Sequence, residues 1–92
     1  MNGEVPLMEG ARVLKEMTLG ANSRVDLETP ASPEEIVDFY KQAMTAKGWQ
    51  PGMAMVQGNM GVLQLKSAAR QLVIKAQGQG ETSKVSMALI GQ

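Results

Sequence analysis

Three methionines near the middle of the chain have side chains and a spacing that could do chemistry. Met53, Met55 and Met60 form the pattern M-x-M-x-x-x-x-M around a glycine-rich turn. Thioether sulfurs are soft ligands that suit Cu(I), and on a strand the first two would project from the same face. Methionine also fills cores that are poor in aromatic rings, or forms adaptable contact patches, and we favour that interpretation. Cu(I) binding by the three methionines stays open as the alternative.

Acidic and hydroxyl side chains are the other candidates for chemistry. Glu34 and Glu35 are adjacent carboxylates, and paired acids can divide acid and base roles when their pKa values differ. They follow a Ser-Pro pair, however, so we interpret them as helix-capping and dipole-stabilising residues. Ser32, Ser67 and Ser83 have no histidine to activate them, and no S-x-x-K motif is present. We therefore predict no catalytic residue and no enzymatic activity.

Composition narrows the classes of partner and cofactor. The chain has no Cys and no His, so the usual ligands of zinc and iron are missing, and we expect no cofactor. Nine basic and nine acidic residues balance, which argues against nucleic acid as a partner. The glycine-rich turns lack the G-x-G-x-x-G and Gly-Lys-Ser/Thr patterns that bind phosphate. Because apolar runs are short, we expect no direct membrane insertion by this chain.

The elements that would position these residues begin with two strands. Residues 1–11 contain Pro and Gly and predict an extended segment that need not pair. Residues 12–29 predict a hairpin, with Gly20 to Ser23 as its turn. In its first strand the alternation places Val13, Met17 and Leu19 on one face and Leu14, Glu16 and Thr18 on the other.

A helix over residues 33–47 is the clearest element. Ser32 is placed as its N-cap, Pro33 as its first residue, and Glu35 as the partner of Ser32 in a capping box. Gly48 is placed to end the helix, with Trp49 folding back onto it. The spacing predicts a single apolar stripe, formed by Ile36, Phe39, Tyr40, Ala43 and Met44. We expect the Tyr40 and Trp49 rings to lie in the core rather than to form a stacking platform.

An antiparallel meander over residues 53–90 follows the helix. Turns are expected at Gly58 to Gly61, at Ser67 to Arg70 and at Gly78 to Thr82. The inward positions should be Leu63, Leu65, Leu72, Ile74, Ala76, Val85, Met87 and Leu89. The fold class is therefore α+β: one domain over residues 1–92, of order ββαβββ(β), with an antiparallel sheet and a single helix packed on one face.

Several short motifs resemble those of a family of small bacterial domains found in lipoproteins and secreted proteins. The matching residues are Pro6, Gly10, Ala11, Ser32, Pro33, Glu34, Glu35, Phe39, Tyr40, Gly48 and Trp49, with Lys66 and Gln71 resembling a later hairpin. The resemblance spans residues 5–90, but Met8 and Glu9 replace the usual Tyr-Pro before Gly-Ala. It implies a location outside the cytoplasm, in the periplasm or anchored to a membrane, for a precursor that carries a signal and a lipid-bearing Cys upstream of residue 1.

The function expected from the sequence is therefore binding without catalysis. We predict an accessory module of the bacterial cell envelope that contacts another protein through a sheet edge or through the bare face of its sheet. The alternative is a carrier of a small ligand or of Cu(I), which would use the cleft between helix and sheet or the cluster of Met53, Met55 and Met60. A monomer is the default oligomeric state.

Overall fold

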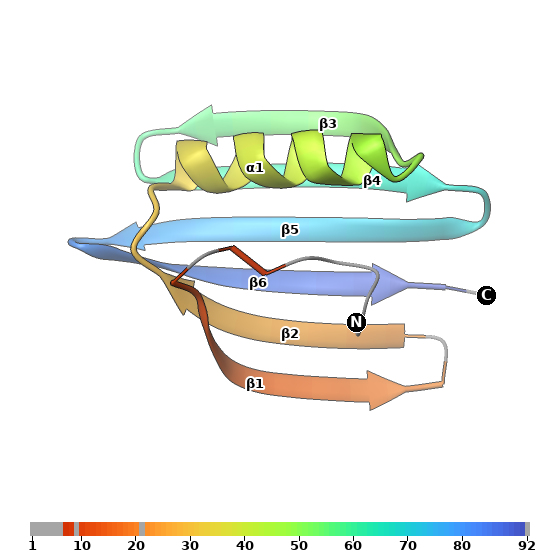
Figure 1. The fold of residues 1–92 in the computed structure, drawn as a ribbon, viewed down its shortest axis with the longest axis horizontal. Helices are drawn as coiled ribbons and strands as arrows, with labels where there is room; N and C mark the ends of the chain where they lie inside the picture. Colours follow the sequence, from red (N-terminus) through yellow and green to blue (C-terminus); the bar gives the residue numbers. More distant parts are fainter. Residues whose placement is uncertain (1–6, 9, 21, 92) are drawn as a thin grey trace.

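One antiparallel sheet of six strands organises the molecule (Figure 1). The computed structural model describes residues 7–8, 10–20 and 22–91; most of the predicted N-terminal segment lies outside these ranges. The strand order is β1-β2-β6-β5-β4-β3, and every neighbouring pair is antiparallel. The elements are β1 (Arg12–Leu19), β2 (Asn22–Thr29), α1 (Pro33–Ala46), β3 (Gln50–Gln57), β4 (Met60–Ser67), β5 (Arg70–Gln79) and β6 (Thr82–Ile90).

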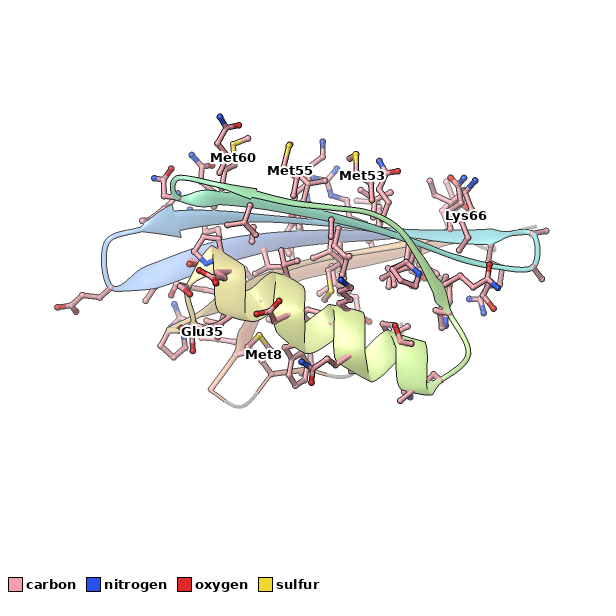
Figure 2. The ribbon with its side chains drawn as sticks, turned by 90° about the horizontal axis from the view of Figure 1, so that it is seen from above. Met8, Glu35, Met53, Met55, Met60 and Lys66 are labelled. Atoms are coloured by element: carbon pink, nitrogen blue, oxygen red, sulfur yellow. The ribbon has the colours of Figure 1, made fainter. Side chains whose placement is uncertain are left out.

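The single helix lies on one face of the sheet, which we call the inner face, and packs against β3, β4 and β5 (Figure 2). Met8, from the described part of the N-terminal segment, lies on the same side and packs against the core. No described element lies over the opposite, outer face. The predicted α+β architecture, with one helix on one face, is confirmed. None of the described helical residues belongs to a stretch with the length and apolar character of a membrane span.

Local hydrogen bonds set both ends of α1. The Glu35 backbone N–H donates to Ser32 Oγ at 3.2 Å, and the Ser32 N–H donates to Glu35 Oε1 at 3.1 Å, which completes the predicted capping box. At the other end Gly48 has φ +95°, and the Trp49 N–H donates to the Met44 carbonyl oxygen at 3.0 Å. These are the features of a Schellman ending, and they turn the chain directly into β3.

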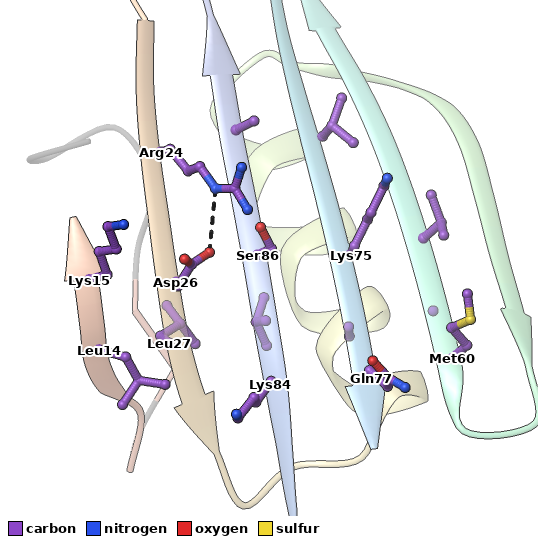
Figure 3. A pocket seen from close by; sticks show the side chains of 16 residues that line it. Leu14, Lys15, Arg24, Asp26, Leu27, Met60, Lys75, Gln77, Lys84 and Ser86 are labelled. Atoms are coloured by element: carbon purple, nitrogen blue, oxygen red, sulfur yellow. Dashed lines mark ion pairs between the residues drawn. The ribbon is translucent and has the colours of Figure 1, made fainter. Parts of the chain in front are cut away.

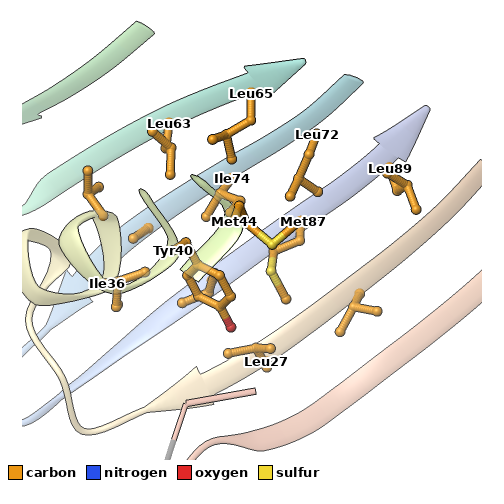
Figure 4. Close-up of a cluster of buried hydrophobic side chains, with 14 of the residues drawn as sticks. Leu27, Ile36, Tyr40, Met44, Leu63, Leu65, Leu72, Ile74, Met87 and Leu89 are labelled. Carbon is orange, nitrogen blue, oxygen red and sulfur yellow. The ribbon is translucent and has the colours of Figure 1, made fainter. Parts of the chain in front are cut away.

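The core fills the space between α1 and the inner face (Figure 4). Ile36, Tyr40 and Met44 are fully buried on the helix side. Every inward strand position predicted from alternation is buried as well: Leu63, Leu65, Leu72, Ile74, Ala76, Val85, Met87 and Leu89. The Trp49 ring is 6% exposed, and the Arg70 guanidinium stacks over it with 5.7 Å between Cζ and the ring centroid. The core interpretation of both Tyr40 and Trp49 is therefore confirmed.

The predicted face pattern of β1 is wrong, because a β-bulge interrupts its pairing with β2. Val13 pairs with Leu27 on the inner face, but the register shifts between Val13 and Lys15. After the shift Met17 pairs with Arg24 on the outer face. A bulge places two residues opposite one and so reverses the alternation beyond it. Val13 therefore faces away from Met17 and Leu19, which lie on the same side as Leu14.

Two glycines predicted to lie in turns belong to strands instead. Gly61 is the second residue of β4, and the close helix start favours a glycine there: a Cβ would lie 2.9 Å from Val37 Cγ2 and 3.2 Å from the Pro33 carbonyl oxygen. Gly78 lies within β5, and its N–H donates to the Asn59 carbonyl oxygen at 2.7 Å. Both glycines lie where another part of the chain approaches closely, and a local turn pattern does not reveal such an approach.

Candidate functional site: the outer face of the sheet

The three methionines singled out in the sequence lie on the outer face and point away from the helix (Figure 2). Met53 pairs with Gln64 and Met55 with Val62 across β3 and β4, while Met60 pairs with Gln57 nearer the turn. Their exposed fractions are 43%, 49% and 55%. Met53 and Met55 project together, as predicted, but they do so into solvent and not into the core. The contact-patch interpretation fits this placement, and the core-filling interpretation does not.

More apolar side chains share this face at the other end of the sheet. Leu14, Met17 and Leu19 of β1 are 46%, 52% and 77% exposed, and Ile90 of β6 is 45% exposed. Ile90 lies on the outer face because its neighbour Leu89 points inward and its partner Gln71 points outward. The two apolar ends of the outer face are therefore the methionine row of β3 and β4 and the β1 side, where Met17 and Leu19 lie near Ile90 and Leu14 stands apart near the start of β1.

A shallow hollow of about 860 Å³ lies between these two ends (Figure 3). Side chains from β1, β2, β4, β5 and β6 surround it, and the helix lies behind the sheet in this view. Its charged lining is Lys15, Arg24, Asp26, Lys75 and Lys84. Its apolar lining includes Leu14, Met60, Val62, Val73 and Ala88. An open surface of this kind offers cations beside apolar contacts, without an enclosed pocket.

The two acids of the outer face are each close to an arginine. Arg12 Nη2 lies 3.1 Å from Glu28 Oε1, and Arg24 Nε lies 3.6 Å from Asp26 Oδ1. Asp26 Oδ1 is shielded from solvent and has no hydrogen bond within the described part of the chain, so the Arg24 charge is its nearest partner. The lysines of this face, by contrast, have no ion-pair partner among the described residues: Lys15, Lys66, Lys75 and Lys84.

The adjacent carboxylates stand on the other side of the molecule, at the start of α1. Glu34 and Glu35 are both exposed there. The backbone and hydroxyl of Ser32 hydrogen-bond Glu35 and lower the pKa of its carboxyl below the usual value. Both Glu35 and Ser32 are thus engaged in capping the helix. Across residues 7–8, 10–20 and 22–91, no group of three or more His, Cys, Asp or Glu side chains comes together that could hold a metal ion.

The space between α1 and the sheet, an alternative ligand site in the sequence analysis, is occupied by core side chains. Leu27, Ile36 and Tyr40 are each 0% exposed there. The Tyr40 hydroxyl has no hydrogen bond of ordinary geometry within the described residues. Burial raises the pKa of Tyr40 to about 12, and the Met8 backbone opposes that rise only in part. This region holds the helix on the sheet and leaves the outer face as the accessible site.

Sequence reasoning found the methionines but missed the lysines beside them. Lys75 and Lys84 alternate with buried Ile74 and Val85, so a period of two already placed them on the outer side of their strands. Their proximity depends on the pairing of β5 with β6, in which Lys75 lies opposite Ser86 and Lys84 opposite Gln77. The register of these strands is a long-range property. The net charge of zero gives no sign that basic side chains gather on one face.

Comparison with known proteins places the chain in a family. No curated protein matches it, and no solved structure does. A family model described as START domain-like matches residues 11–84, which run from the residue before β1 into β6. The match says nothing about a lipoprotein or the cell envelope, so that part of the resemblance stays a prediction. Because the matched segment covers most of the chain, the protein belongs to the START domain-like family.

Proposed function

We propose that this domain is a non-enzymatic binding module that contacts another protein through the outer face of its sheet. The observation that carries the proposal is the gathering of large exposed apolar side chains on the face that no described element covers. They are Leu14, Met17, Leu19, Met53, Met55, Met60 and Ile90. Exposed apolar side chains gathered on one face of a folded protein mark interaction sites. Methionine side chains also adapt their shape to a partner.

The absence of a catalytic role is part of the same proposal. Ser32 and Glu35, two of the hydroxyl and carboxylate candidates considered in the sequence, hydrogen-bond each other's backbone at the helix start. A lowered pKa keeps Glu35 ionised at neutral pH, which does not suit a general acid.

A location in the cell envelope also belongs to the proposal. An apolar segment ending in Cys upstream of Met1 in the native reading frame would support it.

A display selection tests the contact directly. Peptides would be selected on the wild-type domain, sequenced, synthesised and measured against two variants by titration calorimetry. The first variant is Met53→Gln/Met55→Gln/Met60→Gln, which removes the methionine row. The control is Val56→Gln, because Val56 is 41% exposed on the same edge strand but pairs with Gly61 on the inner side.

We expect the selected peptides to bind the triple variant about tenfold more weakly than wild type, which is a loss of roughly 1.4 kcal/mol in binding free energy. Their affinity for Val56→Gln should stay the same. Both variants should unfold at the wild-type temperature to within a few degrees, since the altered side chains are exposed. Peptides that bind the triple variant as tightly as wild type would remove the methionine row as the contact site. A selection that returns no saturable binder would remove the outer face as a whole.

A carrier of a small ligand or of Cu(I) is the second candidate. The hollow of about 860 Å³ and membership of the START domain-like family support a ligand-binding role. Met53, Met55 and Met60 share one face, which a thioether site for Cu(I) requires. An NMR titration with Cu(I) under reducing conditions would shift the methyl signals of all three residues if they bind the ion together. Unmoved signals would dismiss the copper alternative.

A further inference from the structure

The neutral chain is electrically polarised between its two faces. Among the described residues the outer face carries six basic side chains and two acidic ones: Arg12, Lys15, Arg24, Lys66, Lys75 and Lys84 against Asp26 and Glu28. The exposed side of the helix has the opposite balance, with Glu34, Glu35 and Asp38 against Lys41 and Lys47. Both acids of the outer face lie beside arginines, so the excess positive charge belongs to the lysines.

These lysines lie within the sheet and not along its free edge. Lys75 sits on β5 between Ser86 and Val62, and Lys84 sits on β6 between Glu28 and Gln77. The edge strand β3, by contrast, has no charged residue from Gln50 to Gln57. A strand that added to β3 would form backbone hydrogen bonds at the edge, away from β5 and β6. An occupant that uses the positive charge must therefore lie across the face.

The same area supplies an apolar bed for such an occupant. Val62, Val73 and Met60 line the hollow beside Lys75, and Met55 pairs with Val62 at its border. A helix about 10 Å wide covers roughly two strands at a spacing of about 4.8 Å, so one helix can contact β4 and β5 together. Its apolar stripe would meet the methionines and valines, and its flanks would reach lysines of β5 and β6.

From these observations we infer that the outer face receives an acidic amphipathic helix of a partner protein. This inference rests on the proposed protein-contact function and adds the chemistry of the partner. The partner helix places Leu- or Met-like side chains on the methionine row and on Val62 and Val73, and it sets Asp or Glu side chains against Lys75, Lys84 and Lys66. Charge complementarity then fixes which helix binds and in which orientation.

Three synthetic peptides provide the test. Each has about 18 residues, about 27 Å as a helix, with the same apolar stripe and flanks of Glu, Gln or Lys. Each is titrated into the isotope-labelled domain by NMR, which gives the affinity and the contacted residues. The domain is used as wild type, as Lys75→Gln/Lys84→Gln and as the matched control Lys41→Gln, whose lysine is exposed on the helix.

We expect the Glu peptide to bind about tenfold more tightly than the Gln peptide and to shift signals of Val62, Val73 and Met55. Each lysine removed from the face should weaken the binding of the Glu peptide by about threefold, which corresponds to the free energy of one exposed ion pair, so that the Lys75→Gln/Lys84→Gln variant loses about tenfold. The Lys41→Gln control should leave the affinity for this peptide unchanged. The preference for Glu should shrink in about 1 M salt, where charges are screened beyond about 3 Å.

Different failures separate the inference from the proposed function. Equal binding of all three peptides to the outer face would overturn the acidic partner and leave the protein-contact function standing. Binding of none of them would count against both. Shifts confined to the backbone amides of Gln50–Gln57 would assign the contact to strand addition instead. Tighter binding to vesicles of anionic lipid than to the Glu peptide, lost in Lys75→Gln/Lys84→Gln, would assign the face to a membrane surface and overturn the inference.

Discussion

The two faces of the sheet differ in role: the inner face stabilises the fold, and the outer face is exposed to solvent. Along β5 the inner side chains Leu72 and Ile74 are 0% exposed, while Lys75, next in sequence to Ile74, projects from the outer face. Burial of the inner side chains provides most of the stability, because the free energy of transfer scales with the apolar area removed from water. The outer side chains contribute little to stability and so can change with a partner. Neighbouring positions in a strand therefore have different roles: the inner one contributes to stability, and the outer one is available to contact a partner.

The sharpest test of this comparison is a pair of adjacent substitutions. Ile74→Ala should lower the free energy of unfolding by about 3 kcal/mol, because it leaves a cavity between Leu63 and Met87. Lys75→Ala should change it by no more than about 0.5 kcal/mol. Urea unfolding followed by circular dichroism measures both. Similar losses for the two variants would break the division between the faces.

Alkaline titration probes the inner face at its only tyrosine. The pKa of Tyr40 is about 12 in the folded state, against 10.0 for an ordinary tyrosine, so the unfolded chain releases the proton first. This contribution to stability is complete below pH 10.0 and is lost as the pH rises toward about 12, by about 2 kcal/mol in total. Tyr40→Phe removes the titrating group, and the difference between the two proteins isolates it from lysine ionisation.

At neutral pH the same variant should be as stable as wild type or more stable by about 1 kcal/mol, since the buried hydroxyl makes no hydrogen bond of ordinary geometry among the described residues. Thermal unfolding at several pH values gives the comparison. A wild-type curve parallel to that of Tyr40→Phe between pH 10 and 12 would show that the ring is more accessible than the structure indicates.

Close approach of the helix makes Gly61 the most restrictive glycine of the inner face. Gly61→Ala should cost about 1.5 kcal/mol, because its new methyl would lie 2.9 Å from Val37 Cγ2 and 3.2 Å from the Pro33 backbone oxygen. Gly52→Ala is the matched control, with its nearest contact an ordinary 3.6 Å from the Gln64 carbonyl oxygen. Denaturant midpoints report both changes. Partial recovery of stability in Gly61→Ala/Val37→Ala would identify the Val37 contact as the cause.

The smallest effect lies outside both faces, in the turn between β4 and β5. Ala68 has φ +55°, a backbone conformation that a residue with a Cβ adopts at a cost. Ala68→Gly should therefore raise the free energy of unfolding by about 0.5 kcal/mol after the greater entropy of the unfolded glycine is counted. Differential scanning calorimetry should show a higher melting temperature. A lower one would mean that the alanine methyl makes a stabilising contact in the turn.

What the sequence predicted correctly depends on neighbours in the chain. The capping box at Ser32 and Glu35 and the glycine ending at Gly48 involve residues three to five positions apart, so local patterns suffice. The alternation through Leu72 and Ile74 is equally local. The bulge after Val13 and the crowding at Gly61 depend on the partner strand and the helix. No local pattern contains that information.

The candidate site was predicted to the same extent and for the same reason. That Met53 and Met55 share a face follows from their spacing of two, and the structure agrees. Strand order and register decide which face the two methionines share. They also decide that Lys75 and Lys84 lie beside an apolar hollow. The positive character of the outer face therefore became visible only once the strands were paired.

The position of β6 has a consequence for how the protein is made. It follows every other described strand in the sequence, yet it lies between β2 and β5 and is the sole link between the β1-β2 hairpin and the rest of the sheet. During translation the ribosome must release residues 82–90 before the two halves can join. Until then, the hairpin and the β3-β4-β5 unit both expose unpaired edges to chaperones or to neighbouring nascent chains.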